Sequence, residues 1–583
     1  MVSKTNEEAL ETLITNFLIK KQGYYEGLPV NFDKIYGTDS KYFWKFLKKT
    51  QIKELDKLKR FGNDWELKIL ERFDRLVKKH GILQLLKKGI SVDDAHFYLM
   101  HPAPLISSSQ TVKKNFEENI FSCTRQLTYS KNNPLEEIDV VLFINGIPFA
   151  TLELKNVWTG QTARYHGCKQ YREDRDNSQA LFQFGRCLVH MAVDTDEVYM
   201  STKIAGKSTV FLPFNKGFNG GDGNPPNATN HKTSYLWEDV FSRKSVANII
   251  QHFMRFDGSS KERLEKRTLL FPRYHQLDVV RKLISHVNQN GVGQTYLIQH
   301  SAGSGKSNSI TWAAYQLIEA YPCNAKLPGA KGIEKPLFDS VIVVTDRRIL
   351  DRQLRENIKE FSEMKQIIAP VYKSSELKNA LEQGKKIIIT TIQKFPFIID
   401  GIEDLSDKRF AVIIDEAHSS QSGSAHDKMN RTIGKDSNSY SEKDKDIDVD
   451  IDDSQEKIIE AMRSRKMRGN ASYFAFTATP KKITLEKFGT KNTDGSFQPF
   501  HLYTMKQAIK EGFILDVLSN YTTYKSYYEI KKSTEDNPLF NTRKAQKKLR
   551  VFVERNPGTI NVKAEIMLDH FIEKIVNTKK LKG

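Results

Sequence analysis

Hydrophobic residues recur at helical spacing along the first part of the chain. Leu67, Leu70, Phe73 and Leu76 stand three residues apart within the segment 63–79, and the segment 8–18 is patterned in a similar way. An apolar stripe of this kind is typical of an amphipathic helix with one buried face. We therefore expect the chain to begin with mostly helical structure.

A β-hairpin is predicted next. The apolar run 138–144 and the run 148–154 flank the dipeptide Asn145-Gly146, which favours a tight turn between antiparallel strands. Three further β-like runs follow at 188–192, 197–201 and 208–212, and the Gly- and Asn-rich segment 217–230 indicates a surface loop. We expect a first domain over residues 1–258, with its boundary near 256–265.

From residue 294 onward, short β-branched runs alternate with helical patterns. The runs are TYLIQH, VIVVTD, KIIITT, FAVIID and SYFAFT. Such alternation predicts right-handed crossovers and a parallel sheet covered by helices on both faces. The sequence therefore predicts an α/β protein, with a parallel-sheet domain over 259–482 and the start of a further domain over 483–583.

Composition narrows the class of partner. Lysine and arginine number 90 against 71 acidic residues, so the formal charge is +19, and 39% of residues are hydrophobic, too many for a disordered chain. A basic surplus favours a polyanionic partner such as nucleic acid. The apolar runs are far shorter than the ~20 residues of a membrane helix. The four cysteines form no C-x-x-C pair, so we expect a reducing, cytoplasmic location and no membrane partner.

The strand TYLIQH leads into a candidate phosphate-binding loop. The segment His300 to Ser307 reads HSAGSGKS and precedes a helical run. Gly303 and Gly305 would let successive backbone N–H groups of Ala302, Ser304 and their neighbours turn toward a phosphate. Lys306 would meet the β and γ phosphates of ATP, and Ser307 would ligate Mg²⁺. His300 occupies the place of the first Gly in GxxxxGK[ST], so the pattern departs at one position.

A second acidic motif supports this interpretation. The strand FAVIID ends in Asp415, followed by Glu416, Ala417 and His418. Asp415 could hold Mg²⁺ through water, and Glu416 could polarise the water that attacks the nucleotide.

These motifs resemble those of superfamily 2 helicases and translocases over about residues 265–480. The resemblance implies that Gln276 contacts adenine, that His418 belongs to the nucleotide site, and that Thr477 and Thr479 couple nucleotide state to a second motor lobe. It also implies nucleic-acid backbone contacts from 345–354 and 390–395. On the residues alone, Arg347 and Arg348 fit an ordinary solvated surface equally well.

The predicted hairpin carries a second candidate site. Asp139 lies on its first strand, and Glu153 and Lys155 lie on its second. Period-two alternation places Glu153 and Lys155 on one face. A plain two-residue turn would point Asp139 to the opposite face, so we predict a three-residue loop, 144–146, or an equivalent slip in register. Two carboxylates on one face would form a hard oxygen site for Mg²⁺, although charged residues also alternate on any half-exposed strand.

This arrangement resembles the core of PD-(D/E)xK nucleases, with Asp139, Glu153 and Lys155 at the positions of the motif. The proline expected beside the aspartate is absent. The resemblance implies an acidic residue from the first helix, for which Glu8 and Glu11 are candidates. It also implies a Q-x-x-x-Y pair, for which Gln161 with Tyr165 competes with Gln170-Tyr171.

A nuclease core upstream of a superfamily 2 motor is similar to the restriction subunit of type I restriction-modification enzymes. That resemblance implies a complex with modification and specificity subunits, translocation on double-stranded DNA driven by ATP, and cleavage with Mg²⁺. The resemblance implies that arginines of a second RecA-like lobe complete the ATP site, and 483–583 would hold only the start of that lobe, so we expect an incomplete motor that binds ATP weakly and does not translocate alone. Two alternatives are a repair helicase-nuclease, which would recognise a DNA end or fork, and a catalytically silent scaffold that docks to a modification complex.

Overall fold

The computed structural model describes residues 2–60, 62–259, 261–345, 368–370, 384–391, 408–415 and 470–516, together with a few single positions elsewhere. Residues 1–514 form one compact unit, and residues 515–583 form another. The first unit contains two seven-stranded sheets, one mixed and one parallel, so the predicted α/β class is confirmed. Among the helices of the described residues, none combines the length and hydrophobicity needed to cross a bilayer.

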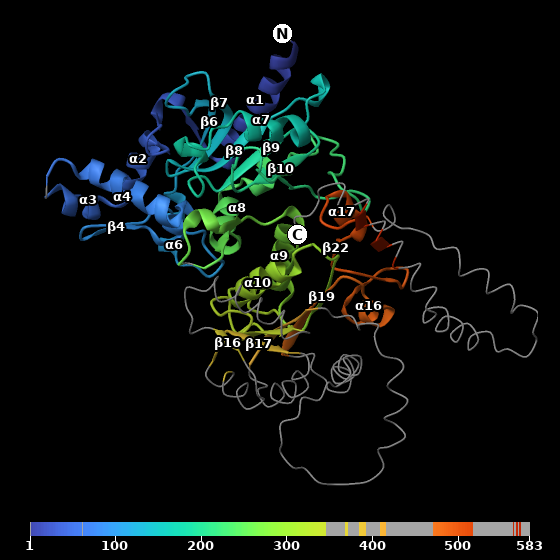
Figure 1. Cartoon of the computed structure of the whole chain (residues 1–583). Helices are drawn as coiled ribbons and strands as arrows, with labels where there is room; N and C mark the ends of the chain where they lie inside the picture. Colours follow the sequence, from blue (N-terminus) through green and yellow to red (C-terminus); the bar gives the residue numbers. More distant parts are fainter. Residues whose placement is uncertain are drawn as a thin grey trace, which may run out of the picture. The chain divides into compact units, whose positions relative to one another are not determined.

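The first sheet is mixed and has the strand order β1-β6-β7-β8-β9-β10-β11. Strands β6, β7 and β8 pair in antiparallel fashion, whereas β8 and β9 are parallel. Figure 1 labels β6, β7, β8, β9 and β10, which lie side by side. Their bounds are Tyr25–Gly27 (β1), Phe121–Thr128 (β6), Glu137–Ile144 (β7), Ile147–Leu154 (β8), Val189–Val193 (β9), Val198–Ser201 (β10) and Leu212–Pro213 (β11).

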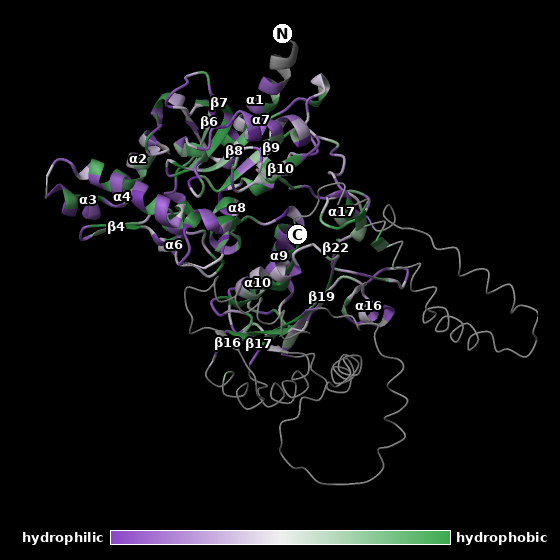
Figure 2. Ribbon diagram, viewed as in Figure 1, coloured by the Kyte–Doolittle hydropathy of each residue, from purple (hydrophilic) through white to green (hydrophobic). Residues whose placement is uncertain are grey.

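Helices cover this sheet because their apolar stripes face it. Leu10, Ile14 and Leu18 of the first helix are buried in the same core as Val140 and Leu152 of the hairpin, and Figure 2 shows green strands beside helices of mixed colour. The helices of this part are α1 (Val2–Gln22), α2 (Ser40–Thr50), α3 (Ile52–Lys59), α4 (Trp65–His80), α5 (Ile82–Lys88), α6 (Gln110–Glu117), α7 (Cys168–Glu173) and α8 (Arg243–Asn248), with a π-helical turn at Ala163–Gly167 and small hairpins β2–β3 (Phe32–Asp33, Thr38–Asp39), β4–β5 (Ile90–Val92, Ala95–Phe97) and β12–β13 (Arg255–Asp257, Thr268–Leu270). The helical prediction for 8–18 and 63–79 is confirmed.

The predicted strand over 208–212 is wrong for most of its length. Only Leu212 of that run belongs to a strand, β11. The backbone N–H groups of Ser208 and Thr209 donate to the oxygens of Ala205 and Gly206, closing turns that use the positive φ of Gly206. Turn bonds therefore replace the ladder that the β-branched run suggested.

The hairpin of β7 and β8 has a two-residue turn and a bulge. Ile144 pairs with Ile147, and Asn145 and Gly146 both have positive φ, +52° and +75°. The register then shifts: Phe143 lies opposite Pro148, but Leu142 lies opposite Ala150. Residue 149 is thus an extra residue in β8. The predicted three-residue loop is wrong, whereas the alternative, a slip in register, is confirmed.

The second sheet is parallel and has the order β16-β17-β15-β18-β19-β14-β22. All six of its strand pairs are parallel. Its strands are β14 (Thr295–His300), β15 (Ser340–Thr345), β16 (Ile368–Pro370), β17 (Ile387–Thr391), β18 (Phe410–Asp415), β19 (Ala471–Thr477) and β22 (His501–Tyr503), and the helices around it are α9 (Tyr274–Asn290), α10 (Lys306–Ile318), α16 (Lys482–Phe488) and α17 (Met505–Lys510), with a small hairpin β20–β21 (Thr490–Lys491, Phe497–Gln498). The five predicted runs coincide with β14, β15, β17, β18 and β19.

The hairpin turn gives a prediction for stability. In Gly146→Ala, the new Cβ would overlap the backbone at Asp39 and Phe43, whereas at Gly160, which also has a positive φ, it would meet nothing within 4 Å. Gly160→Ala should lose about 1–2 kcal/mol of unfolding free energy from backbone strain alone, and Gly146→Ala should lose about 1–3 kcal/mol more. Urea unfolding measures both. Equal losses would show that the turn does not pack as described.

Candidate functional site

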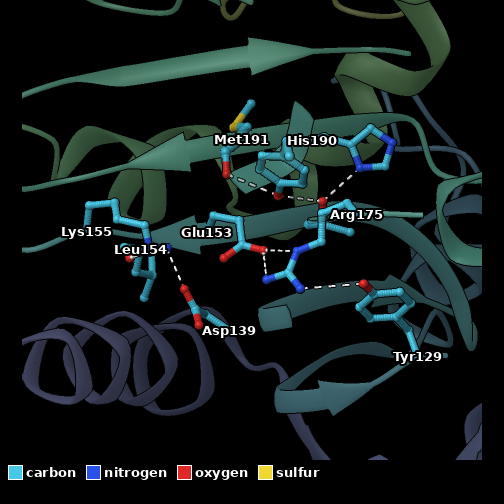
Figure 3. A network of polar contacts seen from close by, with 10 residues as sticks. Tyr129, Asp139, Glu153, Leu154, Lys155, Arg175, His190 and Met191 are labelled. Carbon is cyan, nitrogen blue, oxygen red and sulfur yellow. Dashed lines mark hydrogen bonds and ion pairs between the residues drawn. The ribbon is translucent and has the colours of Figure 1, made fainter. Parts of the chain in front are cut away.

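The bulge in β8 brings two carboxylates to one face of the first sheet. Val140 lies opposite Leu152, and continuing this register places Asp139 directly opposite Glu153. Directly opposed residues of an antiparallel pair point to the same face. Asp139 Oδ2 accepts a hydrogen bond of 2.6 Å from the backbone N–H of Leu154, which ties the aspartate to the end of β8 (Figure 3).

Glu153 is fully buried and holds an arginine. Arg175 Nε donates to Glu153 Oε1 at 2.6 Å, and the Arg175 Nη2 group forms an ion pair with that same oxygen (Figure 3). The other oxygen, Oε2, has no hydrogen-bond partner among the described residues. An unsatisfied carboxylate oxygen in a buried setting is costly, so it marks a position where a ligand would be stabilising.

The electrostatics favour a cation at this position. Burial, and then repulsion from Asp139, raise the pKa of Glu153 to about 8, although Arg175 and Lys155 act in the opposite direction. A divalent ion would relieve both causes, and carboxylate oxygens are the ligands that Mg²⁺ prefers. The residues therefore fit Mg²⁺ through two carboxylates. Within the described part of the chain, no group of three His, Cys, Asp or Glu is close enough to hold a metal, so remaining ligands would be backbone or water oxygens.

Lys155 lies beside the carboxylate pair. Its side chain is buried and donates to the Leu154 backbone oxygen at 2.9 Å. Glu7 of α1 also reaches this end of the strand. Burial raises the pKa of Glu7, the nearby Lys155 lowers it, and the nearby Asp139 raises it further. Glu7 is thus the acidic residue of the first helix that the structure brings to the pair.

The two glutamates that the sequence suggested for this role are placed elsewhere. Glu8 is exposed. Glu11 is buried, but its carboxylate accepts hydrogen bonds from Arg125 Nε at 2.5 Å and from Gln126 Nε2 at 2.6 Å. These candidates are therefore replaced by Glu7, which stands one turn before Glu11 on the same helix.

The structure also separates the two tyrosine candidates. Tyr165 is 67% exposed, whereas Tyr171 is fully buried. The Tyr171 hydroxyl is 2.8 Å from Thr151 Oγ1 and donates to the Met191 backbone oxygen at 3.3 Å. Thr151 shares the face of Glu153, so Tyr171 rather than Tyr165 lies against the carboxylate face. Neither Gln161 nor Gln170 is placed in this network.

The candidate phosphate-binding loop follows β14 on the second sheet. Gly303 and Gly305 have φ of +71° and +74°, and Gly305 is the residue before α10, which Lys306 begins. Ala302 and Ser304 lie in the loop, and Ser307 lies in the first turn of the helix. Backbone N–H groups at a helix N-terminus form an anion site. Lys306 Nζ donates to the His300 backbone oxygen at 3.4 Å.

The start of α9 supports this loop, through its N-cap residue Arg273 and through Gln276 in its first turn. Gln276 Nε2 donates to the backbone oxygens of Ser304 and Gly305, at 2.9 and 3.3 Å, while its Oε1 accepts from the backbone N–H of Arg273. Arg273 Nη2 donates to the Gly303 oxygen at 2.8 Å. The predicted role of Gln276 toward adenine stays a prediction, but its amide is shown to fix the loop.

The presence of His300 at the first glycine position of the GxxxxGK[ST] pattern has a structural explanation. His300 ends β14, where no positive φ is required, and its side chain is fully buried. Its Nε2 lies 2.8 Å from His501 Nδ1, and His501 Nε2 lies 3.0 Å from Asp278 Oδ2. Glycine is therefore not needed here, because the side chain packs below the loop.

Two further residues predicted for the nucleotide site lie at the same edge of the parallel sheet. Asp415 ends β18 and is buried, and Thr477 ends β19, between β18 and β14, with its Oγ1 accepting from the backbone N–H of Thr479 at 3.3 Å. Carboxyl ends of parallel strands form the usual ligand crevice of such sheets. Glu416, His418, Arg347 and Arg348 lie outside the described residues.

Sequence reasoning missed Arg175 and Glu7. Arg175 lies two residues beyond the end of α7, so no helical spacing links it to the predicted site residues. The helix α1 begins at Val2, before the predicted start at residue 8, which is why Glu7 was overlooked.

Two family models match the chain. Residues 4–209 match the N terminus of type I restriction enzyme R protein (HSDR_N), and residues 275–549 match the SWI2/SNF2 ATPase. The chain is 23% identical over 454 residues to the type I restriction enzyme HindI endonuclease subunit of Haemophilus influenzae, covering 76% of this chain and 38% of that protein. It is 22% identical over 409 residues to the putative type I restriction enzyme MjaVIIIP endonuclease subunit of Methanocaldococcus jannaschii, covering 66% and 37%.

The chain thus spans under two-fifths of the length of these curated relatives. Among solved structures, the Sulfolobus solfataricus SWI2/SNF2 ATPase core in complex with dsDNA matches at 13% identity with a TM-score of 0.22, over 41% of this chain and 37% of that chain. A score this low does not by itself establish a shared architecture.

The carboxylate pair gives a pH-dependent prediction. The ordinary pKa of Glu153 is 4.5 and the folded-state pKa is about 8. Between these two values, the metal-free folded protein holds a proton on Glu153 that the unfolded chain has released. The free energy of unfolding therefore falls as the pH rises from the lower pKa to the higher one. Asp139→Asn removes the repulsion from Asp139, which is one of the two causes of the raised pKa of Glu153. It should stabilise the metal-free protein at about pH 8.5 and have a much smaller effect at about pH 6.

Urea unfolding at the two pH values, in a metal chelator, measures this difference. Asp56→Asn, at an exposed position of α3, is the control and should show no gain confined to high pH. A gain from Asp139→Asn that is the same at both pH values would contradict the repulsion between the two carboxylates.

Proposed function

We propose that this chain acts as the R subunit of a type I restriction enzyme, that it cuts DNA with Mg²⁺ at Asp139 and Glu153, and that it binds ATP at the loop before α10. The observation that carries the proposal is the pairing of these two carboxylates on one buried face, with one oxygen of Glu153 left without a partner among the described residues. The relatives are named endonuclease subunits, and we extend that activity to this chain.

Four residues would share the work of the proposed nuclease site. Asp139 and Glu153 would hold Mg²⁺, which supplies an activated water and stabilises charge on a phosphodiester. Lys155, buried beside them with its ammonium at the end of β8, would steady the water or the leaving charge. Glu7 would accept a proton or position a water, because it reaches the same end of the strand.

The ATP site is supported by independent geometry on the second sheet. Lys306 would contact the β and γ phosphates, and Ser307 and Asp415 would hold the Mg²⁺ that accompanies the nucleotide. Glu416 would orient the attacking water, and Thr477 and Thr479 would transmit nucleotide state. Coupled to a second lobe, such a site drives translocation on double-stranded DNA.

The partners follow from charge and family. A formal charge of +19 suits a duplex DNA partner that is gripped by its phosphates. Sequence choice would belong to modification and specificity subunits of a cytoplasmic complex. Purification of the tagged chain from its own cells should yield both subunits, and purification with neither would argue against this assembly.

Cleavage tests the nuclease assignment. Lys155→Ala should lower Mg²⁺-dependent cleavage of unmodified duplex DNA by the assembled complex about 100-fold, because a group that stabilises developing charge is removed. The control is Lys169→Ala on α7, whose ammonium is exposed and pairs with Glu173. A Lys155→Ala complex that cuts like the wild type would refute the assignment.

Nucleotide binding tests the motor assignment separately. Lys306→Ala should weaken binding of a fluorescent ATP analogue by about 10- to 100-fold, as expected for loss of a charge-assisted contact to phosphate. Lys326→Ala, an exposed lysine of the same lobe, should bind like the wild type. If both variants bind equally well, the loop is not the ATP site.

A further inference from the structure

Two donors of Arg175 converge on a single oxygen of Glu153. Nε donates to Oε1 at 2.6 Å, and Nη2 forms its ion pair with Oε1 as well (Figure 3). The guanidinium thus engages Oε1 through one hydrogen bond and one ion pair, and its positive charge opposes the approach of a metal ion to that oxygen. Oε2 has no hydrogen-bond partner among the described residues.

This geometry differs from that of an ordinary structural ion pair. Arginine and carboxylate usually meet as two forks, with one N–H for each oxygen, which satisfies both. Here the side chain of Glu153 has no exposed surface, and that of Arg175 is 5% exposed, so leaving Oε2 open has a substantial cost in a purely structural role. A cation bound at Oε2 would offset this cost and so explain the arrangement.

The guanidinium is also held from its far side. Its Nη1 donates to the Tyr129 hydroxyl at 3.5 Å, and its carbon lies 5.7 Å from the Tyr129 ring centroid. Tyr129 packs edge-on against Phe182 at 4.7 Å between ring centroids. Arg175 is therefore fixed between a packed aromatic cluster and the carboxylate, and it cannot turn to release Oε1 without losing these contacts.

We propose that Arg175 is a positioning residue that limits Glu153 to one ligating oxygen and thereby makes the carboxylate pair selective for Mg²⁺ over Ca²⁺. The proposal rests on the metal site of the proposed function. Mg²⁺ requires near-octahedral coordination and takes carboxylates through single oxygens, whereas Ca²⁺ accepts more ligands and often binds a carboxylate through both oxygens. Freeing Oε1 would therefore help Ca²⁺ and not Mg²⁺.

The test measures ion binding rather than cleavage. Electron paramagnetic resonance counts Mn²⁺ bound to the whole chain without nucleotide, and the ions lost in Glu153→Gln are assigned to this site. Mg²⁺ and Ca²⁺ are then used to displace Mn²⁺ from the wild type and from Arg175→Gln. We expect Mg²⁺ affinity to fall about tenfold in the variant, while Ca²⁺ affinity is kept or increased.

Two further variants keep the result interpretable. Arg172→Gln removes the same charge from α7, three residues before Arg175. Arg172 donates to the Thr209 oxygen at 3.0 Å and stacks on Phe211, so this variant should leave the ratio of the two affinities unchanged. Tyr129→Phe preserves the ring packing but removes one anchor of Arg175, so the ratio should shift in the same direction by a smaller factor.

Equal changes in the Mg²⁺ and Ca²⁺ affinities of Arg175→Gln, or none, would overturn the inference while leaving the nuclease assignment intact. Equal Mn²⁺ binding by the wild type and Glu153→Gln would overturn both, because no ion would then bind at the carboxylate pair.

Discussion

The extra residue at position 149 of β8 is the constraint on which the nuclease site depends. The hairpin turn cannot absorb the slip, because it is locked: Asn145 donates to the Leu99 oxygen at 2.8 Å and accepts from the Ile120 N–H at 2.7 Å, and the Gly146 oxygen accepts from the Asp39 N–H at 2.8 Å. A two-residue turn alone would send Asp139 to the opposite face from Glu153. The bulge corrects this within the strand, which brings both carboxylates to the face covered by α7.

Bringing them together creates repulsion between two carboxylates, one of them fully buried, that the protein offsets only in part. Arg175 and Lys155 offset it, but one oxygen of Glu153 lacks a partner among the described residues. Binding sites often retain unfavourable interactions of this kind, and a bound cation would relieve the repulsion between the carboxylates. On the parallel sheet, the loop before α10 is shaped differently: the side chains of Arg273 and Gln276 hold its backbone oxygens at Gly303, Ser304 and Gly305. In the proposed function, the first sheet would offer carboxylate oxygens to a cation, and this loop would meet a phosphate at the N-terminus of α10.

Much of this could be predicted from the sequence, for physical reasons. Runs such as FAVIID are buried on both faces of a parallel sheet, so their hydrophobicity alone located five strands, and the glycines and Lys306 located the loop. Asp139, Glu153 and Lys155 were identified by alternation within one hairpin. Arg175 and Glu7 were not, because they reach the site from the segment after α7 and from α1, through tertiary packing that no local pattern records. The bulge was foreseen only as one of two solutions, since its position depends on the buried contacts of Asn145.

The central claim is that the carboxylate face of the hairpin binds a divalent ion, and anomalous diffraction from crystals grown with Mn²⁺ tests it most directly. The account predicts an anomalous peak between Asp139 and Glu153, with one Glu153 oxygen toward the ion and the other still on Arg175. Crystals that show Mn²⁺ elsewhere but none between these two carboxylates, with Arg175 bonded as described, would contradict it.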